Sequence, residues 1–588
     1  MSAADLDGAA SETAKGRLHL TTVAGPFDPV RDIAVSPYCF LGCESEHPGW
    51  RNYTYSEPFR DDGDMERSYE AIISLCNHRM RRLAEDLNTR HDMTKSVDFW
   101  RLIAMPWLME LVQRIWVQYV RLEEIKVRGG VVDLQVDIWL DPVDWKFRDI
   151  EQFQDGLLRD PDFNWWLDSH IAAAVAPSSW ALRAIHRVFE RSPAPSPIKP
   201  HERRGWRGAL RRIKMRWGMT DIYGSRWATI FLGVLIAMLP RTKSQHRIHP
   251  DEDGFRPDSF FPAPFLDLLE KMIVATLPES YGARFNEYAV FAAGLPVRPG
   301  RLRLGVIDLW NETEKIAAAF AHEGGERLVI PQHGGFYALL RWHIHAQELE
   351  CRNGAMFTWG WNRYRTANKR LIPLPAPLPS GHANSHRFRD RRLILVGSVI
   401  RFRMMRISVR PNGGAWLDYC RHVVNFFETL TPAVREQAWF RPYMNTATDI
   451  VHDYVTGPFP ELHLLTGSLH EAMIRCRLLV TTGPDTTMHL ALAANVPTVA
   501  YWDPDFNKLS DDAAPYFDRL KQVGIYFDSA EDAARHVNAV WDNVENWWSD
   551  PETQAARKFW VDHYARSSRF WLGHWIFALF RLSREQWR

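Results

Sequence analysis

The chain has 588 residues and 46% of them are hydrophobic, so it is long enough for two or three globular domains with substantial cores. Its net charge of +1 argues against a general nucleic-acid binder, because such proteins usually carry a clear basic excess. The six cysteines form no CxxC pair and no zinc-type cluster with histidine, which indicates reduced thiols in a cytoplasmic protein. The polar N-terminus lacks the apolar stretch of a signal peptide.

The N-terminal part of the chain is predicted to begin with strands and to continue with long helices. Residues 1–16 are expected to form a loose tail, and residues 18–23 and 33–41 short strands. Apolar side chains then recur mostly every three or four positions, which predicts helices over residues 65–88 and 97–120. We interpret these helices as the start of a large helical insertion.

Two segments of that insertion, which spans about residues 65–290, leave alternatives open. The most apolar run, Ala228–Leu239, has about a dozen residues, whereas a membrane span needs about 20. We expect a buried helix there, with a re-entrant or interfacial role as the alternative. We expect the strongly basic stretch 203–216 to form a face exposed to solvent. The alternative is that it contacts anionic lipid head groups.

From residue 327 onward, strand and helix patterns alternate regularly, as in parallel α/β proteins. A buried-strand run ends in the loop Pro331-Gln332-His333-Gly334-Gly335, and a helix over 336–350 and a strand over 356–361 are predicted next. The predicted organisation is a tail (1–16), an N-terminal Rossmann-like unit (17–375) that contains the insertion, a proline-rich linker (376–388), a C-terminal Rossmann-like unit (389–548) and a C-terminal helix (549–588). That last helix is expected to pack back on a domain, with membrane contact as the alternative.

The central stretch of the second unit, residues 477–501, predicts a strand, a turn, a helix and a second strand. Gly483-Pro484 ends the first strand, and Asp485, Thr486 and Thr487 are N-cap residue types that precede the helix. A helix N-terminus presents unpaired N–H groups and the positive end of a dipole, so this turn suits a phosphate or diphosphate. An ordinary capped helix is the alternative interpretation.

His333 is the main candidate for an acid, a base or a donor to phosphate, because it follows a strand directly and precedes two glycines. Glycines at such a position let the backbone approach a ligand closely. The alternative is a loop histidine bonded to the backbone. Gly397, Ser398 and Arg441 also follow strands, and they could surround a diphosphate together with the two threonines.

Signals for metal chemistry and for other enzyme classes are weak. Asp503 and Asp505 have the DxD spacing that binds a divalent ion in one glycosyltransferase fold, but two-residue carboxylate spacing is common, and we assign no metal site. The sequence has no GxxxxGK[ST] motif, no GxGxxG after a strand and no GxSxG elbow. Their absence argues against a P-loop NTPase and a dinucleotide oxidoreductase.

Five blocks of sequence resemble a family of transferases that has no assigned reaction and is encoded with bacterial surface-polysaccharide genes. They spread over most of the chain: SVDFWRLIAMPWL (96–108), DIYGSRWATIFLGVLIAMLP (221–240), IPQHGGFY (330–337), FTWGW (357–361) and LLVTTGPDTTMHLALAANVPTVAYWD (478–503). More distantly, the two-unit plan is similar to glycosyltransferases of the two-Rossmann (GT-B) type. These include transferases of Kdo-like and other nonulosonic acids and the glycerol-phosphate polymerases of teichoic acid.

The resemblance to the polymerases implies roles for both loops. In those enzymes a His-Gly loop of the first half supplies a base, and a turn with serine or threonine in the second half holds the nucleotide phosphates. By resemblance, these roles fall to His333 and to Thr486 and Thr487. Those turns usually read as an aspartate followed by a serine pair, whereas this one reads Gly-Pro-Asp-Thr-Thr, so the resemblance does not identify the donor.

We therefore predict a metal-independent GT-B glycosyltransferase in the cytoplasm, with peripheral contact at the inner face of the membrane as an option. It moves a sugar from a nucleotide-activated donor to a glycan, lipid-linked or protein acceptor in surface-polysaccharide biosynthesis, such as O-antigen or capsule, with no cofactor and no nucleic-acid partner. His333 is the predicted catalytic residue, and the predicted donor-binding residues are Gln332, Gly334, Gly335, Gly397, Ser398, Arg441, Gly483, Asp485, Thr486 and Thr487. The alternatives are a phosphotransferase that moves a polyol phosphate from a CDP donor on the same fold, and a non-catalytic scaffold of a surface-glycan assembly complex.

Overall fold

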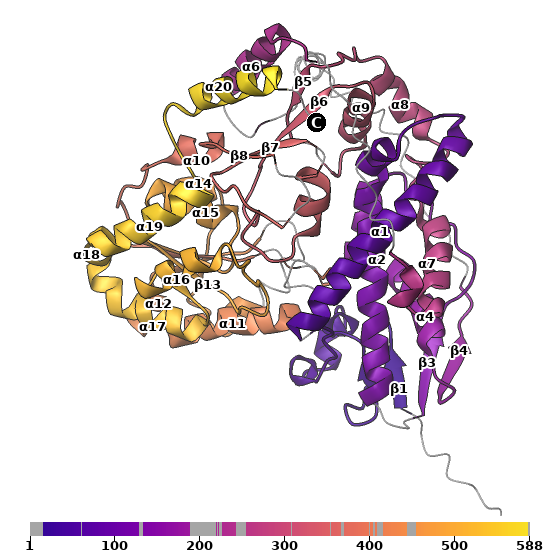
Figure 1. Ribbon diagram of the computed structural model, residues 1–588. Helices are drawn as coiled ribbons and strands as arrows, with labels where there is room; N and C mark the ends of the chain where they lie inside the picture. The colour runs from indigo at the N-terminus through magenta and orange to yellow at the C-terminus, as the bar shows by residue number, and fades with distance from the viewer. Residues whose placement is uncertain are drawn as a thin grey trace, which may run out of the picture.

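The structure, a computed structural model, describes residues 16–59, 61–128, 133–187, 226–242, 255–306, 309–352, 354–365, 370–398, 415–443 and 454–585, together with Met219, Ile222, Ile400, Phe402, Arg403, Arg406 and Ile407. Within these residues the chain is a mixed α/β protein in which three parallel sheets are surrounded by helices (Figure 1). The predicted α/β class with parallel sheets is therefore confirmed. Residues 1–15 of the expected tail and the basic stretch 203–216 lie outside the described residues.

The first sheet belongs to the N-terminal part of the molecule, at the lower right of Figure 1. Its strand order is β2–β1–β3–β4, with β1 at Gly16–His19, β2 at Ile33–Ala34, β3 at Leu134–Ile138 and β4 at Trp180–Ala184. The helices beside it are α1 (Asp62–His91), α2 (Val97–Arg128), α3 (Ile150–Arg159), α4 (Pro161–Val175) and α7 (Ala263–Thr276). The region expected to be a helical insertion thus also contains β3 and β4, which join β1 in a sheet of their own.

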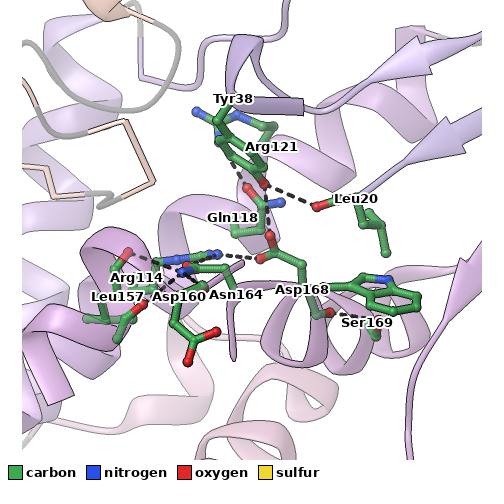
Figure 2. A network of polar contacts seen from close by, with 12 residues as sticks. Leu20, Tyr38, Arg114, Gln118, Arg121, Leu157, Asp160, Asn164, Asp168 and Ser169 are labelled. Carbon is green, nitrogen blue, oxygen red and sulfur yellow. Dashed lines mark hydrogen bonds and ion pairs between the residues drawn. The ribbon is translucent and has the colours of Figure 1, made fainter. Parts of the chain in front are cut away.

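A buried polar network ties α2 and α4 to the segment after β2 (Figure 2). The fully buried Asp168 of α4 accepts hydrogen bonds from the Tyr38 hydroxyl at 2.8 Å and from Nη2 of Arg114 at 2.6 Å. Burial raises the pKa of the Asp168 carboxyl, although the Arg114 guanidinium opposes the shift. Each partner compensates the other's lost hydration, and the pair connects α2 to α4 inside the core.

The second sheet has the order β5–β6–β7–β8, and its first three strands are fully buried, as is usual for parallel sheets. Its strands are β5 (Leu302–Leu304), β6 (Arg327–Pro331), β7 (Ala355–Thr358) and β8 (Leu371–Pro373). Along β6, Val329 packs in a cluster with α6 (Arg226–Met238) and α20 (Trp571–Arg584), whereas Ile330 packs on the opposite side in the cluster that holds α9 (Glu312–Glu323). The helix α8 (Phe285–Ala293) packs on α9.

The third and largest sheet has the order β11–β10–β9–β12–β13–β14. Its strands are β9 (Leu393–Val396), β10 (Ala438–Arg441), β11 (His463–Leu464), β12 (Leu478–Thr481), β13 (Thr498–Tyr501) and β14 (Tyr526–Phe527). The helices around it are α11 (Ala415–Thr429), α12 (Pro432–Arg435), α14 (Leu469–Met473), α15 (Thr486–Ala494), α16 (Ala514–Gln522), α17 (Ala530–Val540), α18 (Val544–Ser549) and α19 (Pro551–Tyr564). The central unit β12–α15–β13 has the predicted strand–turn–helix–strand form.

Several predicted elements are wrong in extent. The strand expected over 18–23 ends at His19, and the strand expected over 356–361 ends at Thr358. The strand expected over 33–41 ends at Ala34, because Pro37 begins a 3₁₀ turn that continues to Phe40. The helix expected over 336–350 is reduced to a π-helical turn at Ala346–Glu350. Phe336 and Ala338 have φ values of +69° and +58°, which are incompatible with a right-handed helix.

The chain crosses between the second and third sheets twice. The expected linker contains the short helix α10 (Pro377–His382), which packs against α15. The C-terminal region forms two helices rather than one: α19 packs on α15 and α16, and α20 returns to the second sheet, where Nε1 of Trp575 donates to the carbonyl of Pro375 at 2.9 Å. These two crossings hold the second and third sheets next to each other.

Candidate active site between two sheets

The two loops singled out in the sequence contact each other directly. The backbone N–H of Gly335, after β6, donates to Oγ1 of Thr486, the first residue of α15, at 2.9 Å. The next N–H, of Phe336, donates to the carbonyl of Pro484 at 3.2 Å. The approach is so close that a Cβ atom on Gly335 would lie 2.5 Å from the carbonyl carbon of Asp485. Glycine is therefore required here for steric reasons.

Gln332 fixes the path of the histidine loop from inside. Its side-chain oxygen accepts hydrogen bonds from the backbone N–H of Trp359 at 2.8 Å and from Nε1 of Trp361 at 2.7 Å. Its Nε2 donates to the carbonyl of Gly334 at 2.7 Å. The Gln332 side chain is buried and its amide is engaged in these bonds, so we assign it to positioning of the loop rather than to contact with a phosphate.

His333 itself is partly exposed and is held by a buried tyrosine and a buried glutamate. Its Nδ1 lies 2.9 Å from the Tyr337 hydroxyl and 3.8 Å from Oε2 of Glu350, and the Tyr337 hydroxyl also donates to Glu350. The Tyr337 hydroxyl also lies 3.4 Å from Nε2 of His333. Because the hydroxyl donates its proton to Glu350, it can accept only from a protonated ring nitrogen, and we assign that proton to the nearer Nδ1. Burial, together with the charge of Glu350, raises the pKa of Tyr337 well above its usual value, so the tyrosine stays protonated.

The buried carboxylate of Glu110 contacts both the segment after His333 and the C-terminal unit. Glu110 of α2 lies 3.0 Å from Nε2 of His345 and accepts a 2.9 Å hydrogen bond from Nε of Arg406. Burial alone would raise the pKa of Glu110, but Arg406 and His345 outweigh it and hold the pKa at about 2. This carboxylate therefore stays ionised and links the first part of the chain, the histidine segment and the C-terminal unit.

The carboxyl ends of β10, β9 and β12 bring several predicted donor-site residues to one edge of the third sheet. Arg441 and Thr481 are both in register with Val396, so the residues that follow these strands share the same edge. The Ser398 hydroxyl faces Gly483, where a Cβ atom would lie 3.9 Å from it. Gly397 packs against the ring of Phe440, and Nη1 of Arg441 donates to the carbonyl of Leu465 at 2.7 Å. In parallel sheets, ligands bind at such an edge.

The N-terminus of α15 is closed by protein in this structure. The carboxylate of Asp485 accepts from the N–H groups of Thr487 at 2.9 Å and Met488 at 3.2 Å, and the Gly334–Gly335 segment covers Thr486. Burial raises the pKa of Asp485 to about 6. The turn thus has the capped geometry that was the alternative interpretation, and polar groups for a ligand lie beside it, at Ser398 and Gly483.

Four residues near the site carried no recognisable sequence signal: Tyr337, Glu350, Tyr419 and Asn507. The hydroxyl of the buried Tyr419 accepts from the N–H of Ser398 at 2.7 Å and lies 2.8 Å from Oγ1 of Thr482, so it joins the ends of β9 and β12. A Cβ atom on Gly483 would lie 3.8 Å from Nδ2 of Asn507, and the buried Oδ1 of that asparagine has no hydrogen-bond partner among the described residues. Asn507 is therefore available to a ligand at this edge.

The possible DxD pair does not gather further ligands. Oδ1 of Asp503 accepts from the N–H of Asp505 at 2.9 Å, which is an ordinary turn contact. Over the described part of the chain, no group of three histidine, cysteine, aspartate or glutamate side chains is arranged to hold a metal ion.

A pocket of about 670 Å³ opens beside the histidine segment, between elements from all three parts of the chain. Its lining residues come from α1, from the segment after Tyr337, from the loop after β7, from β8 and from the loop before α16: Glu66, Arg341, Asn362, Arg363, Tyr364, Arg365, Leu371, Ser510, Asp511 and Asp512. The Ser510 hydroxyl donates to the carbonyl of Ala338 at 2.7 Å, so one wall of the pocket is continuous with the segment that carries Tyr337.

The candidate site therefore lies between two parallel sheets. One α/β unit contributes the histidine loop, and the other contributes the polar strand ends. The family comparison is more specific: the model of the LIC12162 family transferase matches residues 17–579. The chain therefore belongs to that family of transferases. No curated protein is significantly similar to it.

Several solved structures align with part of this chain at low identity and low TM-score. TarM aligns at 11% identity with a TM-score of 0.28, over 44% of this chain and 50% of TarM, so the match spans about half the length of that protein. WaaG, a glycosyltransferase involved in lipopolysaccharide biosynthesis, aligns at 12% identity and a TM-score of 0.29, over 48% of this chain and 85% of WaaG. A candidate UDP-N-acetylglucosamine 2-epimerase from Listeria monocytogenes aligns at 12% identity and a TM-score of 0.32, over 52% of this chain and 81% of the epimerase.

Proposed function

We propose that this transferase is a glycosyltransferase that moves a sugar from a nucleotide-activated donor to a hydroxyl of a glycan, lipid-linked or protein acceptor in surface-polysaccharide synthesis. The observation that carries the proposal is the contact between the His333 loop and the turn at Gly483–Thr486, because it joins the loop of the proposed base to the turn beside the polar strand edge. In this proposal the protein acts in the cytoplasm and needs neither a metal ion nor a cofactor.

His333 is the general base of the proposed reaction. Glu350 and Tyr337 orient the imidazole so that Nε2 can take the proton of the acceptor hydroxyl as that oxygen attacks the sugar carbon. The bond from the sugar to the nucleotide phosphate breaks in the same step. Alignment of the two reactants supplies much of the rate enhancement.

The donor phosphates bind at the edge formed by β10, β9 and β12. Ser398, Arg441 and Nδ2 of Asn507, which faces Gly483, supply donors, and the absence of a side chain at Gly483 gives the phosphate room. Such groups stabilise the charge that develops on the leaving phosphate. The pocket beside Arg341 provides space for the acceptor.

The first test is a thermal-shift screen of the full chain against CMP, CDP, UDP, GDP and dTDP, with and without EDTA. A ligand that binds only the folded state raises the melting temperature by mass action, so one nucleotide is expected to give a shift that survives EDTA. The shift should be lost in Ser398→Ala and kept in Ser549→Ala, a substitution at a surface serine. No shift with any nucleotide would contradict the proposal.

The second test separates the glycosyltransferase from its rivals. With the nucleotide that binds, the mass of the product shows whether a sugar or a polyol phosphate was transferred. A CDP shift and a phosphate-containing product would replace the proposal with the phosphotransferase. If His333→Ala stays folded and leaves the cellular glycan unchanged, the scaffold becomes the better explanation.

A further inference from the structure

The strongest feature outside the candidate site is an apolar surface formed by the outer faces of α6 and α20. On α6, the exposed side chains are Trp227, Phe231, Val234 and Met238. Their spacing of four, three and four residues places all of them on one stripe of the helix. Trp227 is 81% exposed, and a surface helix of a globular protein normally carries charged residues at such positions.

The helix α20 extends the same surface. Phe570, Phe577 and Phe580 are exposed, and Phe577 is 69% exposed. The opposite face of α20, through Trp575 and Leu579, is buried in the same apolar cluster as the inner face of α6, against the second sheet. Because both helices cover one side of that sheet, their outer faces point away from it together, at the top left of Figure 1.

The charges around this surface are positive. Residues 226–242 and 563–584 contain no aspartate or glutamate, and the acidic residue that follows α20, Glu585, pairs with Arg581 at 3.1 Å. Arginines lie at the ends of the helices: Arg241 after α6, and Arg569, Arg581 and Arg584 around α20. Arg569 and Arg584 lie over the rings of Phe570 and Phe580, which places cations next to the exposed aromatic side chains.

We propose that the surface made by Trp227, Phe231, Val234, Met238, Phe570, Phe577 and Phe580 binds a membrane that contains anionic lipids. Aromatic side chains and arginines together suit the boundary between head groups and acyl chains, where amphipathic helices lie in the membrane plane. Acidic residues would repel anionic head groups, and these segments lack them. Every helix of the described chain is too short or too polar to span a bilayer, so this is binding at the membrane surface.

The test measures co-sedimentation of the full chain with vesicles of phosphatidylcholine alone or with about 30% phosphatidylglycerol. We expect binding to the anionic vesicles that weakens as salt is added. Phe231→Glu and Phe577→Glu should each reduce the partition coefficient about tenfold or more. Because both side chains are exposed, the melting temperature should stay unchanged. Arg569→Gln combined with Arg584→Gln, which removes the cations over Phe570 and Phe580, should reduce binding to the anionic vesicles and leave binding to phosphatidylcholine unchanged.

The control variant is Val274→Glu on α7, which adds the same charge at a side chain that is 82% exposed but lies elsewhere. It should bind as the unmodified chain does. Equal binding by Phe577→Glu, or no binding by the unmodified chain, would overturn the proposal. A dimer in solution that Phe577→Glu dissociates, without vesicle binding, would assign the surface to self-association instead. None of these readouts uses nucleotide or turnover, so their failure is distinct from failure of the proposed glycosyltransferase.

Discussion

The N–H of Gly335 donates to the hydroxyl of Thr486, a residue 151 positions further along the chain, at 2.9 Å. This bond joins the loop that carries His333 to the start of α15, so neither α/β unit forms the site alone. The two crossings of the chain at α10 and α20 support the same junction. Substitutions at the junction should therefore change stability and activity together.

Gly335→Ala tests this coupling. The added methyl group would lie 2.5 Å from the carbonyl carbon of Asp485, so the loop has to move away from α15. We expect stability to fall by about 1–3 kcal/mol, as overpacking usually causes, and turnover to fall at least about tenfold. Thermal melts and product formation measure the two effects. Gly381→Ala is the matched control, because nothing lies within 4 Å of its Cβ position. Unchanged melting and turnover in Gly335→Ala would show that the junction is not rigid.

Tyr337→Phe tests whether the tyrosine positions His333. The substitution removes the hydroxyl that lies 2.9 Å from Nδ1 of His333 and that also bonds Glu350, while the ring remains. We expect kcat to fall about tenfold or more with little change in KM, because substrate contacts are kept and only the orientation of the base is lost. Tyr55→Phe, which removes a 2.6 Å bond to the carbonyl of Trp50 away from the His333 loop, should leave kcat unchanged. A rise in KM alone would instead place Tyr337 in substrate binding.

The sequence was sufficient to predict the central unit of the third sheet, because its signals are local. Apolar runs bound by Gly483-Pro484 and by Pro497 give β12 and β13 almost to the residue, and Asp485 caps α15 as its residue type predicts. The α/β class follows from several such units. The contact between the two loops could be suspected from chemistry, but its geometry depends on residues far apart in the chain.

The same dependence explains what the sequence could not predict. Residues 336–350 have a helical pattern, yet two of their backbone N–H groups bond distant segments: Phe336 bonds Pro484 and Arg341 bonds Lys508. Those contacts replace most of the expected helix with turns, and only then does Tyr337 face His333 and Glu350. Similarly, no local signal shows that β3 and β4 join β1, or that Gly335 covers the end of α15. Tertiary contacts decide each of these features.

Asp485→Asn tests the buried cap of α15 through its pH dependence. The pKa of Asp485 is raised to about 6 by burial, so between about pH 4 and pH 6 the folded chain binds this proton more tightly than the unfolded chain. The contribution is fully present below about pH 4 and is lost as the pH rises to 6. Asparagine keeps an acceptor for the N–H groups of Thr487 and Met488 without the charge. From pH 4.5 to pH 8, the free energy of unfolding of the variant should therefore rise by about 1–2 kcal/mol relative to that of the unmodified chain.

Urea unfolding of both proteins at the two pH values measures this difference, and the comparison cancels the titration of other groups. Asp550→Asn is the control, because Asp550 caps α19 with the same pattern of two N–H bonds but is exposed. The change in its difference between the two pH values is the baseline against which the change for Asp485→Asn is compared. A difference for Asp485→Asn that is constant with pH would show that the carboxyl is not protonated in the folded chain.

The buried pair of Arg114 and Asp168 provides the last prediction, on stability alone. Both side chains are at most 1% exposed and lie 2.6 Å apart, and Tyr38 completes the contacts of Asp168 (Figure 2). Asp168→Ala leaves the arginine buried without its partner, so we expect a loss of about 3–5 kcal/mol. Replacing both residues by apolar ones, Arg114→Met with Asp168→Leu, should recover a large part of that loss, because no unpaired charge remains. The exposed pair of Arg67 and Asp64 is the control: Asp64→Asn should cost less than about 1 kcal/mol in urea unfolding. If Asp168→Ala costs no more than that control, water reaches the network, and the pair does not fix α2 against α4.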